Sequence, residues 1–141
     1  MKPQVLALLT AIAWGVGGYF EKKGLQLGNL SPQLGITIRT AVALVVLGGV
    51  SFSQWRTVAE AGPRALLYMV MGGGIVAGSV GMLCYYAAIS GAPLGKVMPI
   101  AFTSPLFGAL MGIVLGGEPL TLKTVLGMAL TVGGIVLLTI G

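Results

Sequence analysis

The sequence predicts an all-α integral membrane protein, a bundle of five transmembrane helices. Of its 141 residues, 56% are hydrophobic and only 8% are charged, and the mean hydropathy is +1.00. In a soluble domain about a quarter of the residues are charged, because its surface must face water. The chain also contains five apolar runs bounded by charged or turn residues, each close to the ~20 helical residues that cross a bilayer core of ~30 Å. Most of the surface is therefore expected to face lipid.

Each run has recognisable ends. The first run begins after Lys2. It is longer than the apolar part of a signal peptide, and no small-x-small cleavage site precedes Glu21-Lys22-Lys23, so we expect it to be retained as a helix. The second contains one interior charge, Arg39. A charged segment, residues 54–64, separates the second run from the third, and its Trp55 suits the headgroup layer. The expected helices, all in one domain of residues 1–141, cover about residues 3–24, 32–52, 65–89, 97–116 and 121–140.

The remaining connections are short and should join antiparallel neighbours. Residues 24–31, 90–95 and 116–120 contain Gly, Pro, Asn and Ser, which suit tight turns between helices. In the fourth run, Pro99 can start the helix, whereas Pro105 lies inside it and removes a backbone hydrogen bond. A kink is therefore expected at Pro105. The kink is either a flexible point for alternating access or only a consequence of how the helix packs.

The composition also restricts the chemistry. The chain has no His and one Cys, Cys84, which excludes imidazole catalysis and an internal disulfide. Its three carboxylates, Glu21, Glu60 and Glu118, are spread along the sequence and leave little for a clustered metal site. We therefore expect that the chain is not an enzyme, that it has no catalytic residue, and that it binds no metal and no cofactor. The pI near 9.7 does not indicate a nucleic-acid partner, because the basic residues lie at the ends of apolar runs, where they are topology signals.

The charge distribution leaves the orientation of the chain nearly balanced. Five spans would place its two ends on opposite sides of the membrane, and the flanking Lys and Arg residues set which side is which. A small bias predicts insertion in both orientations and an antiparallel homodimer of ten helices. A single orientation fixed by Arg56 and Arg64 is the alternative. One side holds Lys2, Arg56, Arg64 and Lys123, and the other holds Lys22, Lys23 and Lys96.

Arg39 is the first candidate for a functional residue. It lies about seven residues into the second span, where an Arg costs about 2.5 to 3.5 kcal/mol to insert. At ~1.5 Å per residue, Glu21 lies at a similar depth across the turn near Gly28. We expect Glu21 and Arg39 to form an ion pair at the rim of a cavity, which substrate or protons perturb. Alternatively, Arg39 snorkels or only holds the fold, and Glu21 lies at headgroup level beside Lys22 and Lys23.

Aromatic residues accompany this pair. Trp14 lies on the same helical face as Glu21, beside a groove made by Gly17 and Gly18. Tyr85 and Tyr86 point about 100° apart, so one of them can reach a cavity. Such rings suit a mostly apolar substrate with one polar end, and a cation could bind over a ring face. The alternative is that these residues belong to the aromatic belt at the membrane surface.

Glycines predict close helix packing in the last two spans. Three of them follow one another at intervals of four, which gives two overlapping GxxxG units, and glycine lets a neighbouring helix approach closely. We expect these residues to serve packing and dimerisation. They are Gly108, Gly112 and Gly116 in the fourth span, with Gly127, Gly133 and Gly134 in the fifth.

The ordered set of motifs resembles one repeat of the EamA family in the drug/metabolite transporter superfamily. Trp14-Gly15 is followed by Lys22, and Arg39 lies where that family often has an Arg. Most members have ten helices in two repeats, so the resemblance implies one half of a ten-helix inverted-repeat drug/metabolite transporter. The other matching stretches are Tyr85-Tyr86-Ala87-Ala88-Ile89, Ala92-Pro93-Leu94, Ser104-Pro105-Leu106-Phe107 and Gly116-Gly117-Glu118-Pro119-Leu120-Thr121.

The chain is also similar, more distantly, to the four-helix small multidrug resistance exporters. Those proteins use a membrane-buried Glu in their first helix, whereas Trp14 occupies the middle of the first span here and Glu21 lies toward its end. By this similarity, the last helix would contribute to the dimer interface.

Together these features predict a secondary transporter, and the resemblance to the EamA family implies that it lies in the inner membrane. It would export small metabolites or amphipathic compounds by alternating access, as an antiparallel homodimer surrounded by membrane lipid. A dual-topology ion channel is one alternative, although it needs a continuous polar track that the spans do not offer. A subunit of a heteromeric half-transporter is the other. Substrate charge stays open, because Arg39 favours anions or zwitterions while Glu21 and the aromatic rings favour cations.

Overall fold

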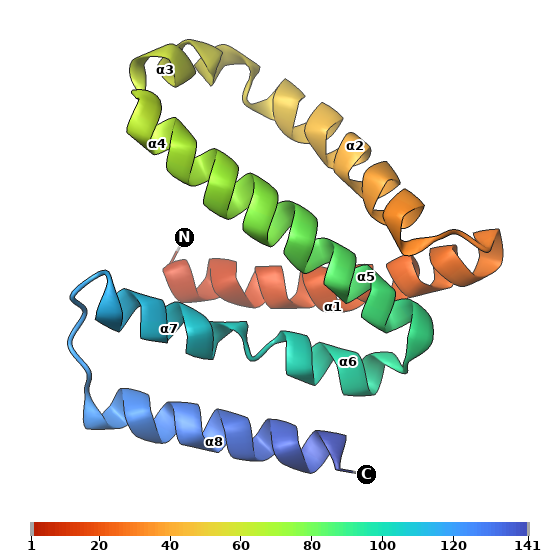
Figure 1. The fold of residues 1–141 in the computed structure, drawn as a ribbon, viewed down its shortest axis with the longest axis vertical. Helices are drawn as coiled ribbons and strands as arrows, with labels where there is room; N and C mark the ends of the chain where they lie inside the picture. Colours follow the sequence, from red (N-terminus) through yellow and green to blue (C-terminus); the bar gives the residue numbers. More distant parts are fainter. Residues whose placement is uncertain (1, 141) are drawn as a thin grey trace. The chain divides into compact units, whose positions relative to one another are not determined.

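The computed structural model describes residues 2–140, which form helices joined by short turns (Figure 1). Five of these helices are long and apolar enough to cross a membrane, so the all-α, five-span fold class is confirmed. The spans are α1 (Pro3–Gly28), α2 (Pro32–Val50), a third helix over Pro63–Gly91, a fourth over Leu94–Val114, and α8 (Leu122–Thr139).

The third and fourth spans are made of several segments. The third consists of α4 (Pro63–Tyr68), the π-helical segment η2 (Met69–Gly81) and α5 (Met82–Gly91). The fourth consists of α6 (Leu94–Ala101) and α7 (Ser104–Val114). Between the second and third spans lie a 3-10 turn, η1 (Phe52–Gln54), and the short helix α3 (Trp55–Glu60).

Several helices begin where the sequence offers a suitable first turn. Pro32 and Pro63 occupy first-turn positions, where the missing N–H would have no intrahelical partner and the fixed φ suits the helix. The Ser31 hydroxyl caps α2 by accepting the Leu34 N–H at 3.3 Å, and the Thr121 hydroxyl caps α8 in the same way. These caps satisfy donors that a helix otherwise leaves open.

The helix ends differ from the expected ranges by a few residues. The first helix continues to Gly28 and ends at Asn29, whose φ of 45° is left-handed, a conformation that Asn tolerates better than most residues. The third begins at Pro63, and the fourth begins directly after Pro93. Because α6 starts this early, Pro99 lies inside it and not at its start. The fourth span is interrupted at residues 102–103, and Pro105 then lies in the first turn of α7.

The π-helical segment in the third span depends on a close backbone approach. The Ser79 hydroxyl donates to the carbonyl of Gly74, five residues back, at 3.0 Å. A Cβ at Gly78 would lie 2.8 Å from the Gly73 carbonyl oxygen, so only glycine fits there without a shift. Wide turns of this kind are rare and are often found at functional sites.

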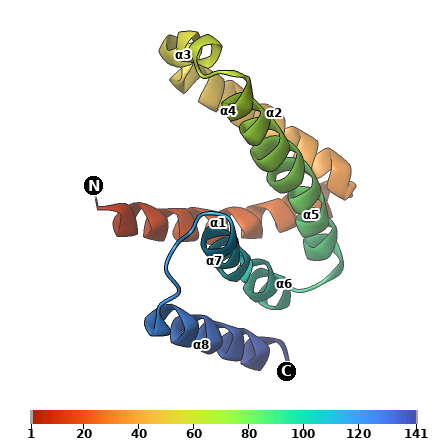
Figure 2. The same cartoon turned by 60° about the vertical axis from the view of Figure 1, so that its left-hand side comes forward.

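The described chain forms two compact units, which divide between Gly91 and Ala92. In the first, α5 packs against both α1 and α2 (Figures 1 and 2). The apolar residues buried there are Leu25, Ile36, Tyr86 and Ile89. In the second unit, α6 packs against α8, and the structure describes no buried residue in α6, α7 or α8. The buried core of the described chain therefore lies where α1, α2 and α5 meet.

Candidate functional site

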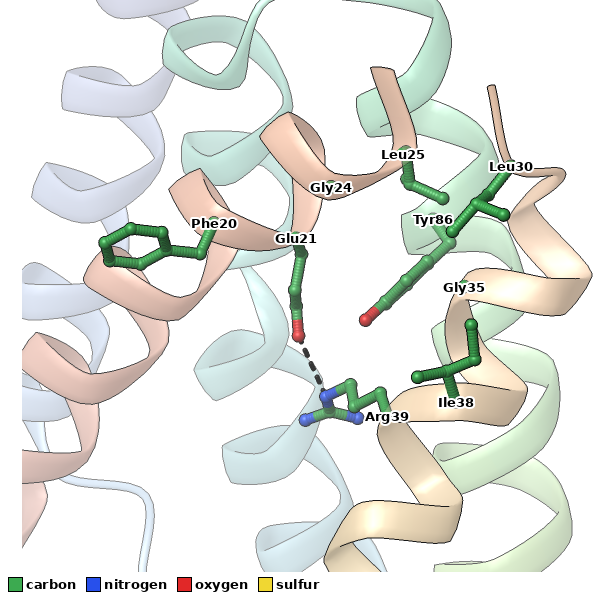
Figure 3. A pocket seen from close by; sticks show the side chains of 9 residues that line it. All are labelled: Phe20, Glu21, Gly24, Leu25, Leu30, Gly35, Ile38, Arg39 and Tyr86. Atoms are coloured by element: carbon green, nitrogen blue, oxygen red, sulfur yellow. Dashed lines mark ion pairs between the residues drawn. The ribbon is translucent and has the colours of Figure 1, made fainter. Parts of the chain in front are cut away.

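A pocket of about 270 Å³ lies beside this core, in the first unit (Figure 3). Its walls come from the C-terminal half of α1, the turn that follows, the start of α2, and α5. Most of the lining is apolar, with an ion pair and one phenol as the polar groups. The lining residues are Phe20, Glu21, Gly24, Leu25, Leu30, Gly35, Ile38, Arg39 and Tyr86.

The ion pair joins α1 to α2 across the pocket. The Arg39 Nε donates to Glu21 Oε1 at 2.9 Å (Figure 3). The Glu21 side chain is 22% exposed and that of Arg39 is 38% exposed, so both charges remain accessible from the pocket. A pair at this distance in an apolar surrounding is attracted more strongly than one in water. A charged group that binds either side chain would therefore compete with the ion pair.

Tyr86 completes the polar part of the pocket from α5. Its ring is almost fully buried, with 2% of the residue exposed, while its hydroxyl points into the pocket toward Glu21 (Figure 3). Three helices thus contribute one polar group each. A ligand that enters the pocket meets a carboxylate, a guanidinium and a phenol against an apolar wall.

Gly35 is what lets α2 approach the other two helices. A Cβ at this position would lie 2.5 Å from Leu25 Cδ2 and 2.9 Å from Tyr86 Cε1. No side chain larger than hydrogen fits without displacing the Tyr86 ring. Because Arg39 lies one helical turn further along α2, this contact also sets the depth at which Arg39 meets Glu21.

The structure brings together three of the five residues expected to bind or couple substrate, namely Glu21, Arg39 and Tyr86. Tyr85 lies outside the pocket lining and packs its ring edge-to-face on that of Tyr86, with the ring centroids 6.1 Å apart. Trp14 is 54% exposed, two turns before Glu21 on α1, and also lies outside the lining. The contribution of α1 to the polar cluster therefore comes from its C-terminal half.

Sequence reasoning did not identify Gly35 or the role of Lys22. Gly35 lies four residues before Arg39, so the spacing that puts both on one face of α2 was a usable signal. Lys22 donates from its Nζ to the carbonyl oxygen of Ile89, at 2.8 Å. No sequence signal indicates that contact, since its acceptor is a backbone atom 67 residues away.

The glycines expected to serve packing fall into two groups. A Cβ at Gly108, Gly127, Gly133 or Gly134 would have no atom within 4 Å, so these positions are open in the described unit. A Cβ at Gly112 would lie 2.8 Å from the Glu118 carboxylate, and one at Gly116 would lie 2.6 Å from the Gly112 carbonyl oxygen. Within the described chain, the middle of the α7 glycine stripe is therefore covered by Glu118.

Comparison with known proteins gives a consistent match over nearly the whole chain. The EamA-like transporter family matches residues 1–140. A protein described as an uncharacterized transporter in the cobO 3′ region of a Sinorhizobium species is 28% identical over 139 residues, covering 97% of this chain and 96% of that protein. The uncharacterized protein MJ1333.1 of Methanocaldococcus jannaschii is 24% identical over 136 residues, covering 96% of this chain and 95% of that one. No solved structure matches.

Proposed function

The chain belongs to the EamA-like transporter family, and from this premise we propose that it is a secondary transporter that exports small metabolites or amphipathic compounds. The family consists of transporters and not enzymes, so a multi-pass membrane protein with a small-molecule substrate follows from membership. Export, the mechanism and the inner membrane as its location are the proposed part.

The observation that carries the proposal is the Glu21–Arg39 ion pair in an apolar pocket. Ionisable residues inside membrane spans are costly, and they commonly mark the path of a substrate or ion. Here the pair bridges two spans at 2.9 Å, with the Tyr86 hydroxyl beside it (Figure 3). The apolar walls suit the body of an amphipathic substrate, and the polar cluster suits its polar end.

Glu21 and Arg39 act in this proposal as a gate. A substrate group that binds either charge competes with the ion pair, as does a proton that neutralises Glu21. Either event weakens the link between α1 and α2, because the attraction depends on both charges. Substrate binding would thereby favour a second arrangement of the spans, which is the coupling that alternating access requires.

Two copies in opposite orientations would form the working transporter. The Lys and Arg count differs by only one between the two sides, and inverted repeats are a common architecture of secondary transporters. Both relatives are of about the length of this chain, since it covers 96% and 95% of them. The open glycines of α8, Gly127, Gly133 and Gly134, provide a surface for a second copy.

Flux into liposomes tests this function. The purified single chain is reconstituted, and uptake is measured for radiolabelled metabolites and for lipophilic cations such as tetraphenylphosphonium. We expect saturable uptake of at least one probe, which Arg39→Gln lowers about tenfold or more and Lys123→Gln leaves intact.

Two results would overturn the proposal. Non-saturating flux at channel rates would indicate an ion channel. Flux that appears only after addition of a different half-transporter would indicate a heteromeric subunit.

A further inference from the structure

Two adjacent residues of α1 hold two different helices. Glu21 contacts α2 through the Arg39 guanidinium, at 2.9 Å. Lys22 contacts α5 through the backbone carbonyl of Ile89, at 2.8 Å. Neighbours in a helix point about 100° apart, so α1 presents one charge to each of its partners. This arrangement makes the polar segment of α1 the point where the three helices are joined.

The Lys22 contact acts on the last turn of α5. A carbonyl there has no intrahelical N–H partner, and a cation at a helix C-terminus is also favourable for the helix dipole. Ile89 is fully buried, with 0% exposed, and the Ser90 hydroxyl donates to the carbonyl of Tyr86 at 2.9 Å. Tyr86 lies one turn before Ile89. Fixing the Ile89 carbonyl to α1 therefore also fixes Tyr86 beside Glu21.

The link between α1 and α2 is of a different kind. A polar contact that joins α2 to α1 is the Arg39–Glu21 ion pair. Another close contact of α2 is apolar, through Gly35 against Leu25 and Tyr86. Glu21 and Arg39 line the pocket, whereas Lys22 and Ile89 do not, so a charged ligand in the pocket meets the ion pair and not the Lys22 contact. The two links should therefore respond differently to substrate.

We propose that Lys22 is a positioning residue that keeps α5 and Tyr86 on α1 while α2 moves. The proposal rests on the proposed function, because it concerns the motion that follows opening of the Glu21–Arg39 gate. In this arrangement α1 and α5 form one rigid pair that carries Glu21 and Tyr86. Helix α2, with Arg39, is the element that shifts against them.

Spin-label distances test this without a substrate. The native Cys84 is exposed on α5, and Val16 and Val45 are exposed on α1 and α2. Val16→Cys paired with Cys84 reports on α1 and α5. Val16→Cys with Val45→Cys in a Cys84→Ala background reports on α1 and α2. Labelled protein in lipid nanodiscs is diluted with unlabelled protein, so that only distances within one chain are measured.

The variants separate the two links. In Arg39→Gln, the distribution of α1–α2 distances should shift or broaden by about 2 Å or more, which is the size of helix shifts in gating transitions. The distribution of α1–α5 distances should stay unchanged. Lys22→Met should broaden the α1–α5 distance, and Lys22→Arg, which retains a donor, should restore it. Lys23→Met is the matched control, because it removes a positive charge from the same side of the membrane.

Two results would overturn the proposal. One is a distribution of α1–α5 distances in Lys22→Met that is as narrow as in the unmodified chain. The other is a broadening of both distances in Arg39→Gln. Either result leaves the flux of the unmodified chain in liposomes as an independent test of the transporter itself, so the two failures are distinguishable.

Discussion

The two units of the chain contain spans of similar hydropathy but differ in what those spans bury. The mean hydropathy of the spans is 1.3, 1.7 and 1.8 in the first unit and 1.8 for both spans in the second. The first unit buries Leu25, Ile36, Tyr86 and Ile89 around an ion pair. In the second unit, none of the described residues of α6, α7 and α8 is buried.

The ion pair and the Lys22 contact that join helices both lie in the first unit. The lowest hydropathy belongs to α1, which carries Glu21 and Lys22, and both of these contact other helices. In the second unit, exposed large residues such as Leu130 and Leu137 have to face lipid or another helix. Hydropathy alone identifies the spans, whereas the polar contacts between helices mark the unit in which we propose the substrate site.

The largest effect is expected from breaking the ion pair in the first unit. Arg39→Gln or Glu21→Gln leaves the other charge without its partner inside the membrane, which is costly. We expect transport in liposomes to fall by a factor on the order of 10 or more. Lys123→Gln at the start of α8 is the control in the second unit and should retain transport. Unchanged transport in both first-unit variants would contradict the assignment of the pocket.

The next effect concerns stability. Gly35→Ala places a Cβ 2.5 Å from Leu25 Cδ2 and 2.9 Å from the Tyr86 ring, and overpacking of this kind costs about 1 to 3 kcal/mol. The free energy of unfolding, measured by denaturant titration in detergent, should fall by that amount. Gly48→Ala, in the same helix with no atom within 4 Å of the added Cβ, should not lower it. Equal effects of the two substitutions would remove the special role of the α2 contact.

A smaller effect is expected on association through the second unit. A Cβ added at Gly133 on α8 would have no atom of its own unit within 4 Å, so the fold of a single chain should tolerate Gly133→Leu. If α8 forms the dimer interface, the dissociation constant should rise about tenfold, equivalent to about 1.4 kcal/mol. Forster transfer between labelled chains in liposomes measures this constant. Gly49→Leu on α2 is the control, and an equal loss of association there would contradict an interface at α8.

The smallest effect is expected at Gly112. A Cβ there would meet the Glu118 carboxylate at 2.8 Å, but that carboxylate is the far end of an exposed, flexible side chain that can turn away. Gly112→Ala should therefore change the free energy of unfolding by less than about 0.5 kcal/mol. A loss as large as that in Gly35→Ala would show that the Glu118 contact is rigid.

The sequence predicts the spans well because each depends on local composition. Five apolar runs with turn residues between them are sufficient to identify five membrane helices, and the pairing of Glu21 with Arg39 follows from their depth across one hairpin. Tyr86 lies in the pocket, but sequence spacing alone did not distinguish it from Tyr85. The choice depends on which face α5 turns toward α1 and α2, and that is a tertiary property.

Other features lie beyond the reach of sequence patterns. The Lys22 contact has a backbone acceptor 67 residues away, and every residue type offers such an acceptor. The spacing of Gly35 and Arg39 could have placed both residues on one face of α2, but the sequence does not show that a Cβ at Gly35 would meet Leu25 and Tyr86. The π-helical segment over Met69–Gly81 is a third case, since its hydrogen-bond shift leaves the apolar composition unchanged.

The orientation of the chain in the membrane tests the central claim most directly. Cys84 is replaced with Ala, a single cysteine is appended after residue 141, and intact cells are labelled with a membrane-impermeant thiol reagent before and after permeabilisation. An antiparallel homodimer predicts that about half of the protein is labelled from outside, because the chain would insert in both orientations. Labelling of all of the chains or of none before permeabilisation would contradict the antiparallel arrangement and require a separate partner half.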